Sequence, residues 1–429
     1  MESMSKWISI VQVSAYHIQS CMMVALYVVM NSVLYVWFKA GDGDEKVKIV
    51  VEEGGGFTAK DMMFCLIWND VSTFWYDSKL FSAAGNLFGG SIPDTLGLWK
   101  SLKEFYLGEC NLYGSIPHSI FNLSLLVTFS LAGNHLTGSL PSEIGNQLPN
   151  LEFLQLRDNE LTGVLPPSIS NCSKLGLLEM SQSNFSGKLT INFSKLRDIY
   201  YINLAKNNFH GRGEADDMRF IDSLKNCTRL RTLSLSNCNL TGVLPISIGN
   251  LSDQLRFLSL AENQLLGSLP SSIGSLVGLS TLRLGLDQFK GKIPTNQFSG
   301  PIPDVIGNLS LLTQLNLDSN KLEGHIPSSL GNCKELNVLN LADNRLSGKI
   351  PSQLLQLPSL TILLNLSRNN LFGSIPSEIK DLKMLSELDL SYNNLSGTIT
   401  SSLGECISLT VLNLSGKSKM HADIYKFNV

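Results

Sequence analysis

Apolar and polar positions follow one pattern that recurs about every 24 residues along most of this chain. In one copy Leu151, Leu154 and Leu156 precede Asn159, and the same spacing begins again at Leu336. From Leu154 to Leu156 the apolar residues flank a polar one, which is the periodicity of a β-strand. The pattern therefore predicts one short strand in each copy, with the leucines directed inward and the residue between them directed outward.

The full pattern reads L-x-x-L-x-L-x-x-N-x-L-x-G-x-(I/L)-P. The Asn follows the strand, where the chain turns, and its side chain offers both a donor and an acceptor to the backbone of that turn. Gly163 and its equivalents suit tight bends. Repetition of the Asn predicts a ladder formed by Asn134, Asn159, Asn207, Asn263, Asn320, Asn344, Asn369 and Asn393.

A fixed period of this length indicates a solenoid, because one copy cannot bury its own apolar face and stacked copies share a core. The spacing is that of a leucine-rich repeat. We predict an α/β repeat solenoid, a right-handed superhelix with a concave parallel β-sheet. Its convex side would consist of short 3-10, helical or irregular segments. About fourteen copies occupy residues 81–416.

A variant of the pattern narrows this interpretation. Together with L-x-G-x-I-P, the run Ile302-Pro-x-x-Ile306-Gly-Asn-Leu-Ser310 resembles the plant-specific extracellular leucine-rich repeat. The tract 217–227 is also similar to the ectodomains of immune-type (subfamily XII-like) leucine-rich repeat receptor-like kinases. The resemblance implies a truncated relative without the kinase, since the chain contains no Gly-rich loop, H-R-D or D-F-G motif. It also implies a co-receptor kinase as a partner.

Two irregularities interrupt the period. Pro294 and Pro303 are so close that one copy, near 295–303, is predicted to lack its strand, with a local kink or an imperfect gene model as the explanation. An unbroken strand ladder across 284–317 would reject the kink. An insert near Gly213–Asp222 begins with acidic residues and continues with Met218, Ile221 and Leu224, which predicts a short amphipathic helix on the convex side.

The two ends depart from the repeats. Residues 1–40 resemble a signal or anchor, because 21–38 contain no charge and approach the length of a membrane span. Residues 41–80 hold a degenerate N-terminal cap around Cys65 and Trp68. We therefore expect exposed apolar edges on the first repeat. Residues 417–429 form a tail unrelated to the pattern.

Composition and motifs exclude several classes of function. The net charge of −3 gives no electrostatic reason to expect nucleic acid. The six histidines show no His-Glu-x-x-His motif, and the chain has no Gly-x-Ser-x-Gly elbow and no P-loop. We therefore expect no enzyme, no metal site and no cofactor.

The eight cysteines show no Cys-x-x-Cys pair, so a zinc or redox site is not expected. Cys110 and Cys238 occupy the Asn position of the pattern. Four others lie at one position beside a loop and are expected to be buried apolar residues rather than disulfides, namely Cys172, Cys227, Cys333 and Cys406.

The density of N-glycosylation sequons suits a secreted or cell-surface protein, although an Asn- and Ser-rich repeat also produces such motifs by chance. Two of them, at Asn365 and Asn413, lie between the two strand leucines, where a glycan would block the concave face. The eleven candidates are Asn122, Asn171, Asn184, Asn192, Asn226, Asn239, Asn250, Asn308, Asn365, Asn394 and Asn413.

The outward strand positions vary without harm to the core, so they hold the functional signal. Between 150 and 290 they are rich in aromatic residues and arginine, which anchor interfaces. Arg157, Lys206, Arg231, Arg256 and Arg283 suggest a positive stripe suited to a peptide with acidic groups or a free carboxylate. The remaining candidate ligand-binding residues are Phe153, Gln155, Glu179, Tyr201, Asn203 and Phe257.

We therefore predict an extracellular module, at the plasma membrane or secreted, that binds a peptide or protein on its concave face in plant immune or developmental signalling. Residues 21–38 would provide membrane anchoring. Two alternatives stay open. The chain could be a secreted inhibitor-type repeat protein that binds a cell-wall hydrolase, or a non-functional truncated receptor fragment.

Overall fold

The computed structural model describes residues 78–87, 89–210, 218–285, 295–399 and 401–416, and the backbone of short strands at 28–29, 32–33 and 419–422. The chain divides into two compact units. The first comprises residues 1–138 and 147–160, and the second comprises 139–146 and 161–429. Most of the expected anchor, cap and tail lie outside the described residues. Within the anchor, β1 (Val28–Val29) and β2 (Ser32–Val33) pair antiparallel.

The first unit stacks four short parallel strands, each one coil of the chain. Their register is continuous, so that Leu80, Glu104, Thr128 and Phe153 are successive partners. These strands are β3 (Leu80–Ser82), β4 (Glu104–Tyr106), β6 (Thr128–Ser130) and β8 (Phe153–Gln155). A second pair of strands and two 3-10 helices complete the coils: β5 (Tyr113–Ser115), β7 (His135–Thr137), η2 (Asp94–Leu98) and η3 (His118–Asn122).

The second unit repeats this arrangement with ten parallel strands in register. The α/β repeat solenoid predicted from the sequence is therefore confirmed. The strands are β10 (Leu177–Glu179), β12 (Tyr201–Asn203), β14 (Thr232–Ser234), β16 (Phe257–Ser259), β18 (Thr281–Arg283), β20 (Gln314–Asn316), β22 (Val338–Asn340), β24 (Leu363–Asn365), β26 (Glu387–Asp389) and β28 (Val411–Asn413).

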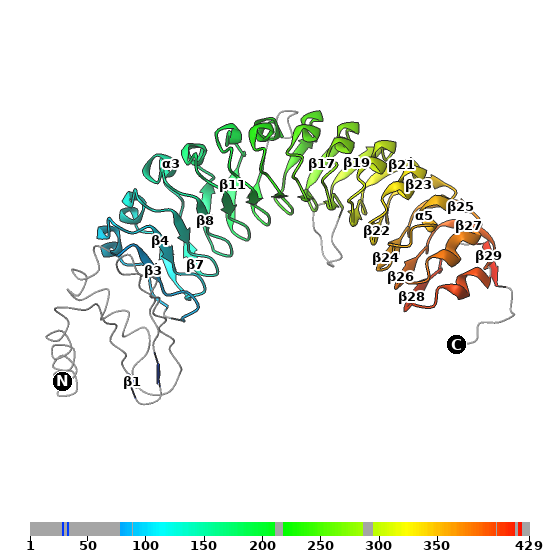
Figure 1. Ribbon diagram of the computed structural model, residues 1–429, viewed down its shortest axis with the longest axis horizontal. Helices are drawn as coiled ribbons and strands as arrows, with labels where there is room; N and C mark the ends of the chain where they lie inside the picture. The colour runs from blue at the N-terminus through cyan, green and yellow to red at the C-terminus, as the bar shows by residue number, and fades with distance from the viewer. Residues whose placement is uncertain are drawn as a thin grey trace. The chain divides into compact units, whose positions relative to one another are not determined.

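Strands β10 to β26 each lead into a second strand and then a short helix, and β28 leads into a second strand. The helices lie on the side of the coils away from the first strands (Figure 1). The second strands are β9 (Thr162–Val164), β11 (Asn184–Gly187), β13 (Asn208–Phe209), β15 (Thr241–Val243), β17 (Gln264–Ser268), β19 (Gln297–Gly300), β21 (Lys321–His325), β23 (Arg345–Gly348), β25 (Asn370–Gly373), β27 (Asn394–Ile399) and β29 (Lys419–Ala422). The helices are α3 (Ile144–Gln147), η4 (Pro167–Asn171), η5 (Phe193–Lys195), α4 (Phe220–Ser223), η6 (Leu224–Asn226), η7 (Ile246–Asn250), η8 (Ser271–Ser275), η9 (Asp304–Asn308), η10 (Ser328–Asn332), α5 (Ser352–Leu355), η11 (Ser377–Asp381) and η12 (Ser401–Glu405).

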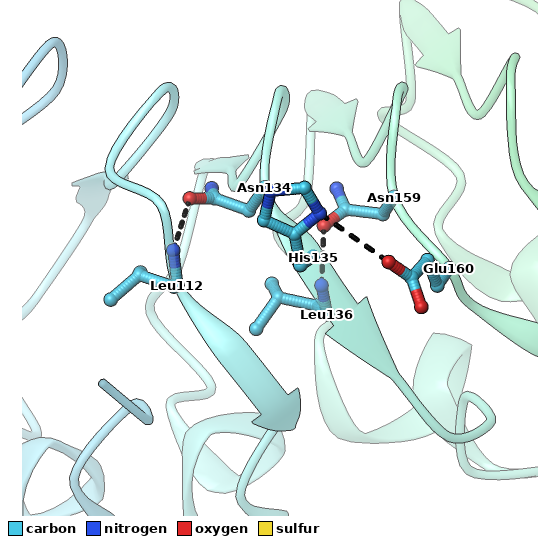
Figure 2. Close-up of polar contacts among 6 residues, drawn as sticks. All are labelled: Leu112, Asn134, His135, Leu136, Asn159 and Glu160. Atoms are coloured by element: carbon cyan, nitrogen blue, oxygen red, sulfur yellow. Dashed lines mark hydrogen bonds and ion pairs between the residues drawn. The ribbon is translucent and has the colours of Figure 1, made fainter. Parts of the chain in front are cut away.

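The predicted asparagine ladder is confirmed. In the first unit Asn134 Oδ1 accepts hydrogen bonds from the backbone N–H groups of Cys110 and Leu112, both at 3.0 Å. Asn159 repeats the contact one coil later with the N–H of Leu136 (Figure 2). The Nδ2 of each Asn donates to carbonyl groups of its own and the preceding coil. Each Asn therefore joins two coils at a buried turn, which satisfies the backbone groups that the turn leaves unpaired.

The cysteines match the expectation for the described residues. Cys110 and Cys238 take the ladder position, and the thiol of Cys238 lies 3.0 Å from the carbonyl oxygen of Leu204 in the preceding coil. The four loop-side cysteines are buried and none is in a disulfide: Cys172, Cys227, Cys333 and Cys406. Cys21 and Cys65 lie outside the described residues.

The recurrent glycine has a steric reason as well as a conformational one. Gly163 has a φ of +85°, which a side chain adopts only at a cost. A Cβ at this position would lie 3.0 Å from the Cβ of Ser139, which belongs to the preceding coil. The glycine therefore lets the second strands approach closely.

The prediction that one copy, near 295–303, lacks its strand and forms a kink is wrong. Strand β18 pairs directly with β20 in the ordinary register, so the ladder is unbroken. Asn296 takes the ladder position of the coil that begins with β18, and its Nδ2 donates to the carbonyl oxygens of Leu284 at 2.9 Å and Leu260 at 2.8 Å. Ladder residues elsewhere donate to a carbonyl three positions back, whereas Leu284 is twelve back. The irregularity is therefore an insertion of nine residues within one coil, and the copy keeps its strand.

Two other expectations concern the insert near Gly213–Asp222 and the apolar edge of the first repeat. Near the insert, Met218, Ile221 and Leu224 are buried and helical turns follow in α4 and η6, although 211–217 lie outside the described residues. The exposed apolar edge expected on the first repeat is wrong for Leu80 and Phe81, which are only 8% and 5% exposed. The ring of Phe81 stacks on Phe105 and meets the edge of Trp99, so aromatic packing protects it on the described side.

Candidate ligand-binding face

The outward side chains of the ten strands β10–β28 form one surface of the second unit, which we call the strand face. In each of the strands β10–β26 the central leucine or isoleucine is buried and the residues on either side point outward, whereas the central Leu412 of the terminal strand β28 is exposed. Register aligns these residues into rows that cross the coils. One row contains Tyr201, Thr232, Phe257 and Thr281, and the ligand-binding predictions for this unit fall in it or beside it.

Glu179, Tyr201 and Asn203 are brought together on β10 and β12. One carboxylate oxygen of Glu179 accepts from Tyr201 Oη at 3.0 Å and from Asn203 Nδ2 at 2.9 Å. The other accepts from the N–H and hydroxyl of Ser181. Glu179 is only 7% exposed, so its role is to fix the Tyr201 ring rather than to meet a ligand itself. A buried carboxylate is tolerated here because its oxygens are hydrogen-bonded.

Phe257 and Arg283 form a second cluster, on β16 and β18. The guanidinium carbon of Arg283 lies 5.8 Å from the centre of the Phe257 ring, within the range of a cation–π contact. Arg283 Nη2 also donates to Gln314 Oε1 on β20 at 3.1 Å. Phe257, Arg283 and Gln314 are all half-buried, so this cluster offers a positioned cation beside an aromatic ring.

The predicted cations of this unit do not form one straight stripe. Arg231 and Arg256 share a row just before their strands, Arg283 lies within its strand, and Lys206 lies beyond its strand. Arg256 is exposed, but its Nη1 donates to the carbonyl oxygen of Gly278 at 2.7 Å, which ties it to the next coil. Lys206 Nζ donates to Gln182 Oε1 at 3.3 Å. The charges are therefore spread across the face.

The first unit contains the remaining predicted residues. Phe153 and Gln155 flank the buried Leu154 on β8 and are half-buried, so they point outward as expected. Arg157 is exposed two residues beyond the strand. No contact among the described residues joins these three side chains to one another.

The later coils of the strand face are polar and internally satisfied. Asn340, Asn365, Asp389 and Asn413 end their strands, and each accepts a hydrogen bond from the backbone N–H two residues further on, at 2.9–3.2 Å. Side chains of this kind present few unsatisfied groups to a ligand. The concentration of ligand contacts between 150 and 290 stays a prediction.

Sequence reasoning missed two contributors to this face. Gln314 orients Arg283, and Ser181 binds Glu179. Gln314 occupies the same row as Phe257, so register alone identifies it once β18 and β20 are known to be neighbours. Ser181 follows the strand and has no distinguishing spacing.

Within the described ranges, no group of three or more His, Cys, Asp or Glu side chains is arranged to hold a metal ion. No helix in this part of the chain is long and apolar enough to cross a bilayer.

Comparisons with known proteins agree with this architecture. A family model for the leucine-rich repeat matches nine stretches of the chain, at 101–123, 125–147, 150–172, 229–251, 254–276, 311–333, 335–357, 362–382 and 384–406. Receptor-like protein 39 of Arabidopsis thaliana is 32% identical over 175 residues, which are 40% of this chain and 16% of that protein. Receptor kinase-like protein Xa21 of Oryza sativa is 42% identical over 96 residues, 22% of this chain and 9% of that one. The chain thus spans less than a fifth of either relative.

Solved structures show the same fold. A TDR receptor structure superposes with a TM-score of 0.71 at 30% identity, over 80% of this chain and 56% of that chain. The ectodomain of the Arabidopsis receptor kinase HAESA, solved with an N-terminally extended IDA peptide hormone ligand, gives a TM-score of 0.67 at 32% identity, over 80% of this chain and 58% of that chain.

Proposed function

The chain is a leucine-rich repeat protein similar to plant receptor-like proteins and receptor kinases, and we propose that it recognises a peptide or protein ligand on its strand face outside the cell. The observation that carries this proposal is the pair of preorganised clusters, Glu179–Tyr201–Asn203 and Phe257–Arg283–Gln314. Aromatic rings and arginines held in place by neighbours lose little conformational entropy on binding, which is the property of interface anchors.

The ligand class follows from the shape and charge of the face. A row of parallel strands offers a long surface with repeating side chains, which suits an extended peptide or a protein edge. The positive groups at Arg231 and Arg283 suit a ligand with acidic groups or a free carboxylate. The HAESA ectodomain, with which this chain shares its fold, was solved with a peptide hormone. We extend the proposal to plant immune or developmental signalling, with a co-receptor kinase as second partner.

The test compares two sets of substitutions in the secreted chain. One variant replaces Tyr201, Phe257 and Arg283 by alanine, and the matched control replaces Asn316, Asn340 and Asp389. Each protein is immobilised and exposed to apoplastic extract, and the retained peptides and proteins are identified by mass spectrometry and then titrated individually.

We expect wild type and control to retain the same peptide or receptor kinase, and the first variant to lose it. Equal loss of binding in both variants would reject the assignment of the site. Recovery of a cell-wall hydrolase as the main partner would replace the receptor proposal with the inhibitor alternative.

A further inference from the structure

We propose that Asn365 and Asn413 carry N-linked glycans that cover the strand face from β22 to β28, so that ligands of the second unit are confined to β10–β20. This inference rests on the extracellular location in the proposed function. It adds a modification that divides one continuous sheet into an open and a closed tract.

Position in the fold distinguishes these two sequons from the other nine. Asn365 and Asn413 end strands β24 and β28, and register places both in one row with Asp389 between them. Their side chains therefore project from the strand face itself. Five others occupy a different equivalent position, the last residue of a 3-10 helix on the other side of the coils: Asn122, Asn171, Asn226, Asn250 and Asn308.

The acceptor atoms at these sites are compatible with modification. Asn365 uses Oδ1 to accept from the N–H and hydroxyl of Ser367, at 3.1 and 2.7 Å, and no described residue engages its Nδ2. In the reaction, a bond forms between Nδ2 and the first sugar carbon, the bond from that carbon to a lipid-linked diphosphate breaks, and one amide proton is released. All the described contacts of Asn365 therefore survive.

Asn413 keeps its network as well. Its Nδ2 donates to Asp389 Oδ2 at 3.1 Å and lies 3.3 Å from Ser391 Oγ. Glycosylation removes one of the two amide hydrogens and leaves the other, so one of these contacts persists. The local fold thus accepts sugars at both positions, and the half-buried carboxylate of Asp389 keeps the bond from the backbone N–H of Ser391 on its other oxygen.

The extent of cover follows from the spacing of strands. Neighbouring strands lie about 4.8 Å apart, and an N-glycan is bulky and solvated, so a sugar chain on β24 reaches over β22 and β26. A second chain on β28 closes the remaining end. Six strands, β10 to β20, stay open across five steps, or about 24 Å. About seven residues of extended peptide span that distance.

The experiment uses the full chain secreted from plant cells. Glycopeptide mass spectrometry measures occupancy at every sequon, and hydroxyl-radical footprinting measures the accessibility of Leu363 and Val411. Both are repeated on the double variant Asn365→Gln, Asn413→Gln, which keeps the amides but removes the sequons. Asn308→Gln, at a helix end, is the matched control.

We expect both strand-face sites to be occupied, and oxidation of Leu363 and Val411 to rise in the double variant while that of Phe257 stays constant. The control should leave all three unchanged. Occupied helix-end sequons with bare Asn365 and Asn413 would overturn this inference alone, as would unchanged oxidation after loss of the glycans. If none of the eleven sequons is occupied, the extracellular location in the proposed function fails as well.

Discussion

Asn263 provides the sharpest test of how the coils are held together. It is fully buried, and its Oδ1 accepts from the N–H groups of Cys238 at 3.1 Å and Leu240 at 3.0 Å in the preceding coil. Its Nδ2 donates to the carbonyl oxygens of Leu235, Leu260 and Ala261 at 2.8–3.0 Å. One side chain thus serves five backbone groups that have no access to solvent.

Substitution Asn263→Ala leaves two buried N–H groups without an acceptor, at about 1–3 kcal/mol each. The sum is about 2–6 kcal/mol, and we expect about 3 kcal/mol because a water molecule in the space vacated would satisfy one of the groups. Asn263→Asp should cost at least as much, since its second oxygen faces three carbonyl oxygens. Asn370→Ala is the control, because Asn370 is exposed and lies beside the ladder residue Asn369.

Two measurements check this expectation. Urea denaturation gives the change in unfolding free energy, and amide hydrogen exchange reports on the coil itself, which matters because a solenoid need not unfold as one unit. The amides of Cys238 and Leu240 should exchange faster in Asn263→Ala, with distant coils unaffected. A free energy within about 0.5 kcal/mol of the control, with unchanged exchange at these two amides, would refute the ladder as a source of stability.

Three further predictions concern other repeat positions. Gly163→Ala should destabilise the chain by about 1–2 kcal/mol because of the left-handed φ, whereas Gly404→Ala, with no atom within 4 Å of the added Cβ, should be neutral in the same urea titration. Burial raises the pKa of Cys238 and of Cys227 to about 12 from the ordinary 9.0, so their thiols should resist alkylation in the folded chain. The free energy of unfolding should fall as pH rises from about 9 toward 12, because in that range the thiols ionise only in the unfolded chain. Ser183→Asn should raise the midpoint of thermal unfolding, because the hydroxyl of Ser183 is buried at the ladder position with no partner among the described residues; a lowered midpoint would contradict this.

The repeat could be predicted from the sequence because each copy must meet the same steric and hydrogen-bonding requirements. The nine-residue insertion before Asn296 could not be predicted in this way. The segment that begins at Asn296 and the segment before it both match the end of the repeat pattern. The sequence therefore contained two equally good candidates for the end of the coil that begins with β18. Only the bond from Asn296 to Leu284 shows which of them closes the coil. Apolar pattern therefore determines the core more reliably than it determines the order of loops.

The strand face shows a similar limit. Arg256 and Arg283 were both predicted as outward arginines in neighbouring coils, Arg256 just before its strand and Arg283 within its strand. In the structure Arg256 donates to the carbonyl oxygen of Gly278, while Arg283 lies over Phe257. The difference depends on what the neighbouring coils present, a loop carbonyl of the following coil for Arg256 and a strand side chain of the preceding coil for Arg283. Spacing along one copy contains no information about that.

The hydrogen bonds of the cations lead to one last expectation about binding. Lys206 and Arg256 are oriented by neutral oxygens, an amide side chain and a backbone carbonyl, which fix their direction without cancelling their charge. An acidic ligand would therefore gain an ion pair without first breaking one. Such an interaction between partly exposed charges is screened by salt, so the affinity of an acidic peptide ligand should fall as ionic strength rises, chiefly through a slower association rate. Surface plasmon resonance over a range of salt concentrations measures this, with Lys206→Gln expected to reduce the slope. An affinity that does not change with salt would show that the aromatic contacts alone determine recognition.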